Sequence, residues 1–146
     1  MTTTRPGPQV KLKETRITRR EDVTDDLFLL WLERDPEFNF KPGQYCTIGV
    51  AGTERPYSIS SAPHEDSLEL FVEVIPPPDG VLTPTLHQMG IGDSMTLRPR
   101  AKGIFTLEPI LPNHLLVCTV TGVAPYVSYI RDYLYKGLSG HHFYVI

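Results

Sequence analysis

The chain has 146 residues, of which 40% are hydrophobic and 21% charged, and its formal net charge at pH 7 is -3. This length fits about one domain core, given the usual range of roughly 100 to 200 residues per domain. A weakly acidic chain offers no broad basic field, so nucleic acid is not an expected partner. No apolar run approaches a membrane span, and the N-terminal stretch lacks the apolar segment of a signal peptide.

The two cysteines lie far apart in the chain. Cys46 and Cys118 each sit inside an apolar run, which predicts two buried reduced thiols rather than a disulfide. An iron–sulfur cluster takes about four cysteine ligands, or two with two histidines, so none is expected within this chain. His141 and His142 are adjacent in an expected strand and should point to opposite faces, so no metal site is expected. These features favour a cytoplasmic protein.

Up to about residue 111, short apolar runs alternate with turn signals, as is typical of an antiparallel sandwich or barrel. Proline fixes φ and glycine permits positive φ, so stretches such as PPPDG and GIGD separate the strands. The expected organisation is a tail over residues 1–13 and an all-β domain over residues 14–111. The expected strands read VKLKETRIT, LFLLWLE, QYCTIGV, RPYSISS, LELFVEV and SMTLRPR.

Beyond this region the pattern changes to strand, helix, strand. LLVCTV is a continuous apolar run of the kind found in strands buried on both faces. Pro125 suits the first position of a helix and Gly137 the position just past its end, and HHFYVI reads as a second strand. Residues 112–146 therefore predict the first β-α-β unit of a parallel-sheet domain. Such a sheet has open edges, so we expect either a longer protein or self-association through the incomplete edge.

Two stripes run along the expected helix. One is aliphatic and repeats at three and four residues, through Val127, Ile130 and Leu134, as expected for a packed face. The other is aromatic and is interpreted as packing rather than as a cofactor-binding surface; it consists of Tyr126, Tyr129 and Tyr133.

The stretch RPYSISS allows two interpretations. Strand alternation puts Arg55 and Tyr57 on one face and Pro56 and Ser58 on the other. Taken alone, it fits an edge strand with a surface arginine and a half-buried tyrosine. It also fits a cofactor site, because a guanidinium offers a fork of donors to a diphosphate, a tyrosine ring can lie on a planar ring, and a serine can bond to that ring's polar edge.

Two further stretches suggest phosphate sites, and each has a plain alternative. In PDGVLTPTL, Gly80 permits close backbone approach, and a short helix follows whose amides could bind an anion or simply cap a turn. In TVTGVAPY, a strand runs through a glycine turn into a helix N-terminus, which suits a nucleotide phosphate. A single glycine at such a turn is also common for packing reasons alone.

The order and spacing of these motifs resembles the ferredoxin–NADP reductase family, most closely its bacterial ferredoxin or flavodoxin reductase branch. The collinear set is FKPGQYCTIGV, RPYS, GVLTPTL, MGIGDSMTLRPRAKGIFTL and LLVCTVTGVAPYVSYIRD, and it covers essentially residues 10–146. The resemblance implies a six-stranded antiparallel barrel that binds FAD, followed by the start of an α/β NAD(P)-binding domain with a parallel sheet.

The resemblance also implies roles for individual residues. Arg55 would bind the FAD diphosphate, Tyr57 would pack on the isoalloxazine and Ser58 would bond near the reactive flavin nitrogen; Tyr57 and Ser58 are thus the catalytic candidates. The other implied cofactor-binding positions are Pro56 beside them, Val72, Glu73, Val74 and Ile75 along the next strand, Gly80, Leu82 and Thr83 around the diphosphate, and Thr121, Gly122, Val123, Ala124 and Pro125 at the nucleotide turn.

One position departs from the family pattern. Val120 stands where the family's glycine-rich turn has its first glycine, and this side chain would narrow the approach of a nucleotide. The expected function is an FAD-dependent oxidoreductase that passes electrons from NAD(P)H to ferredoxin, flavodoxin or another iron–sulfur protein. The alternatives are a flavin-binding electron-transfer subunit that uses no nicotinamide, and a non-catalytic fragment.

Overall fold

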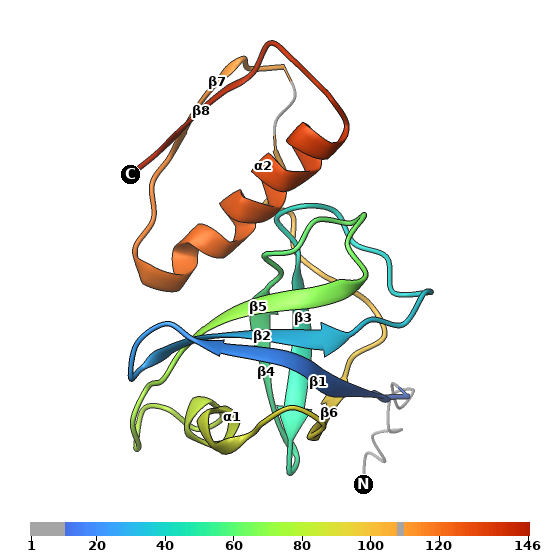
Figure 1. Cartoon of the computed structure of the whole chain (residues 1–146), viewed down its shortest axis with the longest axis vertical. Coiled ribbons are helices and arrows are strands. Elements are labelled where there is room, and N and C mark those ends of the chain that lie inside the picture. The colour runs from blue at the N-terminus through green and yellow to red at the C-terminus, as the bar shows by residue number, and fades with distance from the viewer. Residues whose placement is uncertain (1–10, 108–109) are drawn as a thin grey trace, which may run out of the picture.

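A computed structural model describes residues 11–107 and 110–146 as a barrel with a smaller C-terminal unit on one side (Figure 1). Most of the expected N-terminal tail, residues 1–10, lies outside the described residues. The elements are β1 (Lys13–Asp22), β2 (Leu27–Glu33), β3 (Tyr45–Val50), β4 (Thr53–Ser58), β5 (Ser67–Glu73), α1 (Thr83–Gln88), β6 (Ser94–Leu97), β7 (Asn113–Leu116), the 3₁₀ turn η1 (Val120–Val123), α2 (Ala124–Tyr135) and β8 (His142–Val145).

The barrel is a six-stranded antiparallel sheet with the strand order β4-β3-β6-β1-β2-β5. Its two outer strands approach each other where Ile59, just past β4, forms an isolated bridge to Leu70 in β5. This bridge nearly closes the sheet on itself, which protects strand edges that would otherwise be open to other chains. The expected six-stranded antiparallel barrel is confirmed.

Alternating side chains of the strands fill the barrel. In β2, Phe28, Leu30 and Leu32 are buried, whereas the residues between them are only half-buried. Successive side chains of a strand point to opposite faces, so one face of LFLLWLE packs in the core. Burying each of these side chains contributes about 1.5 to 3 kcal/mol relative to exposure, which makes this core the main stabilising feature of the barrel.

Several expected strand boundaries were wrong by a few residues. β4 begins two residues before Arg55 and ends at Ser58, because Ser60 and Ser61 turn to hydrogen-bond with Glu69 instead of continuing the ladder. β6 ends at Leu97, ahead of Pro99, whose missing N–H cannot extend a ladder. The strand expected over LLVCTV is also displaced, since β7 covers Asn113–Leu116.

The C-terminal unit confirms the expected strand, helix, strand order. β7 and β8 pair in parallel, and Figure 1 shows α2 lying between this small sheet and β5 of the barrel. The helix begins at Ala124 with Pro125 in its first turn, and Gly137 follows its end with φ of 62°. This left-handed value suits a residue without Cβ.

The buried face of α2 is the aromatic one. Tyr126, Tyr129 and Tyr133 are buried, as the packing interpretation predicted, and Tyr126 donates a hydrogen bond to the Val117 carbonyl oxygen at 2.8 Å. The expectation of an aliphatic packed face was wrong for Leu134, which is exposed. The larger tyrosine rings span the distance to β7 and β8, so their stripe faces the sheet.

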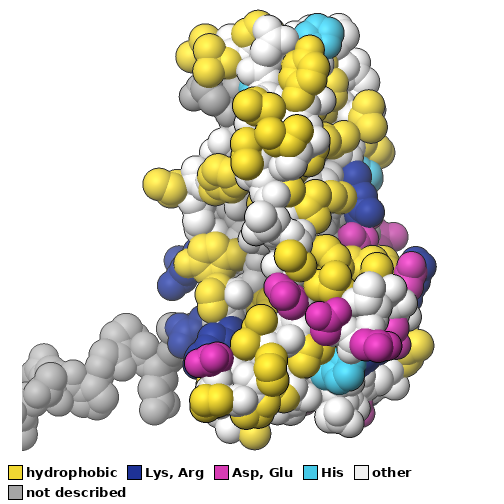
Figure 2. Space-filling view, turned by 90° about the vertical axis from the view of Figure 1, so that its left-hand side faces the viewer, with side chains coloured by type: hydrophobic (Ala, Val, Ile, Leu, Met, Phe, Trp, Pro, Cys, Tyr) yellow, Lys and Arg dark blue, Asp and Glu magenta, His cyan; other side chains and the backbone are white. Residues whose placement is uncertain are grey.

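Apolar side chains gather on the surface of the C-terminal unit (Figure 2). The most exposed large ones include Leu115, Leu134 and Ile146, each with more than 60% of its area accessible. Within the described part of the chain, no helix is both long and apolar enough to cross a membrane.

Candidate functional site

Two neighbouring cavities open where β4, the end of β5 and the turn before α2 meet. Their volumes are about 420 Å³ and 340 Å³, and Pro56, Tyr57 and Ile75 line both. The larger is completed by Ser58, Phe71, Glu73, Thr121, Gly122 and Ala124, and the smaller by Arg55, Asp79, Gly80, Val81, Leu82 and Thr83. These shared walls make one elongated site with a wide end and a narrow end.

Tyr57 and Ser58 stand at the end of β4 on the wall of the larger cavity. Pro56 lines the same cavity, so the strict alternation of faces expected for RPYS does not hold at this strand end. Burial raises the pKa of Tyr57 to about 12, against a smaller opposing effect of Arg55. The phenol is therefore neutral near pH 7 and offers a flat ring and a hydroxyl group rather than a proton-transfer acid.

Arg55 is exposed at the rim of the smaller cavity. Its Nη1 donates to the Glu54 carbonyl oxygen at 2.8 Å, and no carboxylate among the described residues forms an ion pair with it. The neighbouring Glu54 carboxylate is taken by Arg98, at 2.7 and 3.0 Å, and these hydrogen bonds lower the pKa of Glu54. Most donors of the Arg55 guanidinium thus remain available to an anion.

The loop after β5 folds back onto the end of that strand. A Cβ on Gly80 would lie 1.6 Å from the Ile75 carbonyl oxygen, so only glycine fits this approach. The Thr83 hydroxyl accepts a hydrogen bond from the Ile75 N–H at 3.0 Å, and Leu82 is buried in the core. Gly80 and Thr83 therefore hold the wall of the narrow end in place, and the expected helix after Leu82 is present as α1.

Two of the residues 72–75 line the site. The Val72 side chain is buried in the barrel core, whereas Glu73 and Ile75 line the larger cavity. β5 ends at Glu73, so Val74 and Ile75 already belong to the loop. That this stretch borders a ligand through its main chain stays a prediction.

The turn before α2 lies across the larger cavity from β4. Thr121, Gly122 and Ala124 line the cavity, which brings them together with Tyr57 and Ser58 from more than 60 residues earlier in the chain. Two other expected residues lie elsewhere. Val123 lines a separate cavity between the barrel and α2, and Pro125 is buried in the first turn of that helix.

Val120 has a strained backbone. Its φ is 45°, in the left-handed region that β-branched residues rarely adopt and that costs roughly 1 to 2 kcal/mol. The resembled family has glycine at this position, and glycine adopts such a φ without strain. The side chain is about half exposed, with 48% of its area accessible.

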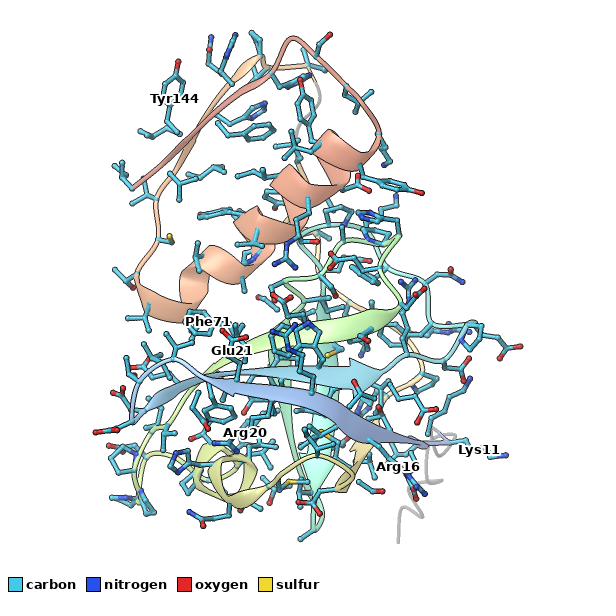
Figure 3. All side chains as sticks on the ribbon, in the orientation of Figure 1. Lys11, Arg16, Arg20, Glu21, Phe71 and Tyr144 are labelled. Atoms are coloured by element: carbon cyan, nitrogen blue, oxygen red, sulfur yellow. The ribbon has the colours of Figure 1, made fainter. Side chains whose placement is uncertain are left out.

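Sequence reasoning missed Asp79 and Val81, which line the smaller cavity, and Phe71. Phe71 lines the larger cavity and also the cavity under α2, and Figure 3 shows it between β5 and the first turn of that helix. The sequence did contain a signal for Phe71, because it lies two residues before Glu73 in an alternating strand and the two side chains therefore share one face.

Comparisons with known proteins agree with this geometry. The family model for the oxidoreductase FAD-binding domain matches residues 14–104. A ferredoxin–NADP reductase A of Sorangium cellulosum is 37% identical over 75% of this chain and 41% of its own length. A ferredoxin–NADP reductase of Pseudomonas aeruginosa is 39% identical over 74% of this chain and 43% of its own length. The chain thus spans less than half the length of these two relatives.

Solved structures share the fold. A ferredoxin NADP+ reductase from Neisseria gonorrhoeae with bound FAD and NADP superposes with a TM-score of 0.78 at 24% identity, covering 94% of this chain and 68% of that one. A phthalate dioxygenase reductase superposes with a TM-score of 0.78 at 20% identity, covering 92% and 43%. The barrel, the motif order and the matching family model together show that the chain belongs to the oxidoreductase FAD-binding domain family, among flavoproteins of the ferredoxin–NADP reductase type.

Proposed function

We propose that the elongated site holds FAD, with the isoalloxazine in the larger cavity and the diphosphate in the smaller one. The observation that carries this proposal is that both cavities share Pro56, Tyr57 and Ile75. A ligand with a planar ring at one end and a negatively charged group further along matches their order. A mononucleotide would leave much of the narrow end unfilled.

The residues of the chain divide the binding between them. Tyr57 supplies a flat face for the ring, Ser58 a hydroxyl group for its polar edge, and Arg55 charge-assisted hydrogen bonds to the diphosphate. Gly80 and Thr83 hold the loop that borders the diphosphate against Ile75. When bound, FAD supplies the electron chemistry, and these side chains bind and orient it.

NAD(P)H is the proposed co-substrate of the complete enzyme. Its place would be the turn at Thr121 and Gly122, which lines the larger cavity beside the N-terminus of α2, where the helix dipole favours an anion. In this organisation, residues 14–111 are the FAD-binding barrel, and residues 112–146 are the first β-α-β of a nucleotide-binding domain. These two residue ranges are part of what we propose.

A ferredoxin, a flavodoxin or another iron–sulfur protein is the proposed electron partner. The support is that relatives of this chain are reductases of ferredoxin or flavodoxin. A cytoplasmic location is part of the same proposal, since Cys46 and Cys118 are both free thiols. Self-association through the exposed apolar surface of the C-terminal unit remains a proposal as well.

The second candidate is a flavin-binding electron-transfer subunit that uses no nicotinamide. Val120 favours it, because a branched side chain stands at the turn where a nucleotide would approach. The two candidates share the flavin site and differ only in what reduces the flavin.

Identification of the chromophore tests the flavin site. The purified chain, reconstituted if necessary, is denatured and the released flavin is separated against FAD and FMN standards. We expect FAD in about equal amount to protein and no covalent flavin. FMN alone, or a folded sample that takes up no flavin, contradicts the proposed site.

Stopped-flow reduction then separates the two candidates. Flavin bleaching after mixing with NADPH or NADH supports the reductase, whereas bleaching by dithionite but by neither nicotinamide supports the electron-transfer subunit. The chain is measured beside a form extended to the length of its reductase relatives, and that form should be reduced faster, since alignment of reactants contributes several kcal/mol.

A further inference from the structure

A buried polar network joins the barrel to α2. Glu69 in β5 has only 4% of its area accessible, and its Oε1 lies 2.9 Å from the Ser60 hydroxyl. The other carboxylate oxygen, Oε2, accepts a hydrogen bond from Arg131 Nη1 of α2 at 2.8 Å. One helical turn earlier, Ser128, which is fully buried, donates to the Ser61 carbonyl oxygen at 2.7 Å.

These contacts lie on a face of α2 different from the tyrosine face. Ser128, Arg131 and Tyr135 follow one another at three and four residues, the spacing that places side chains in one stripe. Tyr135 stacks on His64 of the barrel, with ring centroids 3.7 Å apart and planes within 5°. α2 thus packs on its own sheet through its tyrosines, of which Tyr126 and Tyr129 also contact Phe105, and on the barrel through further polar and ring contacts.

Apolar packing alone leaves the helix incompletely supported. A cavity of about 230 Å³ remains between the barrel and α2, lined by Phe71, Val127 and Arg131 among others. Dispersion contacts are lost across such a gap. The hydrogen bonds and the ion pair beside the cavity therefore help to fix the orientation of the helix on the barrel.

The network is close to the flavin site on both sides. Ser60 follows Ser58 by two residues, a rise of about 7 Å along an extended chain. Ser128 follows Ala124, which lines the larger cavity, by four residues, a rise of about 6 Å along a helix. A small rotation of α2 on the barrel would therefore move Thr121 and Gly122 relative to the ring site.

We propose that Glu69 and Arg131 are positioning residues, which hold the turn at Thr121 and Gly122 in register with Tyr57 and Ser58. The consequence for the flavin rests on the proposed function, whereas the positioning of α2 does not. A buried ion pair often contributes no more stability than a well-packed apolar pair of similar size. The ion pair instead helps to fix the orientation of α2 on the barrel, because the Arg131 guanidinium and the Glu69 carboxylate bond only in a narrow range of orientations.

The position of α2 can be measured without any flavin. Spin labels are attached to Asp25→Cys on the barrel and Ser139→Cys on the C-terminal unit, both exposed positions. The background carries Cys118→Ser, and Cys46 is too buried to react. Pulsed dipolar spectroscopy then gives the distribution of distances between the two labels, and its width reports how firmly the unit is held.

The decisive variant replaces the ion pair by an apolar pair, Glu69→Leu with Arg131→Met. We expect this protein to keep the helical circular dichroism of the unsubstituted chain and to broaden the distance distribution at least twofold. The single variant Arg131→Lys keeps the charge, so its distance distribution should be narrower than that of the apolar pair. The matched control is Lys136→Met, which breaks an ion pair with Asp132 within the same helix, 2.6 Å long, and should leave the distribution unchanged.

Three results would overturn the proposal. They are an unchanged narrow distribution in the apolar pair, equal broadening in Lys136→Met, and loss of α2 helicity in the apolar pair, which would assign the network to stability alone. With FAD bound, the apolar pair should also change the visible circular dichroism of the flavin while its FAD affinity stays within about twofold. Failure to bind FAD at all would count against the proposed function but leave the distance result intact.

Discussion

The barrel and the C-terminal unit differ in how each obtains its stability. The barrel has a large core of its own, built from strands that share one nearly closed sheet, and Leu30 and Leu70 are completely buried in it. The buried cluster of the C-terminal unit centres on Leu116, Tyr126 and Tyr129, between one helix and two strands. The barrel therefore supports the site, whereas the smaller unit depends on its contacts with the barrel.

The largest expected effect separates the two regions by core substitution. Leu30→Ala should lower the free energy of unfolding by about 2 to 5 kcal/mol, because it removes buried methyl groups and leaves a cavity. Leu115→Ala, on the exposed face of β7, should change it by no more than about 0.5 kcal/mol. Urea denaturation followed by circular dichroism measures both. Similar losses from the two substitutions would erase the distinction.

Hydrogen exchange should show the same contrast amide by amide. Amides of β2 and β5, hydrogen-bonded inside the barrel sheet, should exchange only on global unfolding. Amides of β8, in a two-stranded sheet, should exchange roughly 30-fold faster or more, a difference of about 2 kcal/mol. Equal protection in β5 and β8 would mean that the chain unfolds as a single unit.

Relief of the strain at Val120 should stabilise the C-terminal unit slightly. Val120→Gly removes a β-branched residue from φ of 45°, although glycine loses more conformational entropy on folding. The free energy of unfolding of the C-terminal unit should therefore rise by up to about 1 kcal/mol. The control is Val123→Gly in the same turn, where φ is -69° and glycine should destabilise by a similar amount. Equal destabilisation by both would show that Val120 is not strained.

The smallest expected effect is a pH dependence of the C-terminal unit. Burial, with a smaller contribution from His141, lowers the pKa of His114, and the two rings face each other at 2.8 Å between nitrogens. The unfolded chain therefore binds this proton more readily than the folded chain does. The contribution of neutral His114 to folding stability is complete above the pKa of histidine in the unfolded chain, about 6.5, and is lost as the pH falls below it. Faster exchange of β8 amides at pH 5.5 than at pH 7.5, abolished in His114→Phe after correction for intrinsic exchange rates, would confirm this sign.

Local patterns in the sequence predicted an antiparallel sandwich or barrel, and the family resemblance narrowed this to a six-stranded barrel and pointed to the candidate site. Alternation in LFLLWLE, the proline and glycine breakers, and the order of RPYS before the glycine turn carry information about neighbouring residues. Contacts between distant segments were not predictable in the same way. The burial of Glu69 and its bond to Arg131 depend on how α2 lies on β5, and a single glutamate in a strand gives no sign of a partner 62 residues away.

The sequence also could not predict which face of α2 is buried. Val127, Ile130 and Leu134 have the spacing of a packed stripe, and so do the tyrosines one position earlier. Both stripes satisfy helical periodicity. Only the position of β7 and β8 determines which stripe is buried, and that position is a tertiary property.

The most direct test of the account is a comparison of FAD with riboflavin, which carries the same ring without the diphosphate. Binding of each to the unsubstituted chain and to Arg55→Ala is followed by flavin fluorescence. Arg55→Ala should weaken FAD binding by about 30- to 100-fold, equivalent to roughly 2 to 3 kcal/mol for a lost charge-assisted contact, and leave riboflavin binding within about twofold. Unchanged FAD affinity, or an equal loss for both ligands, would contradict the claim that the barrel binds the diphosphate of FAD through Arg55.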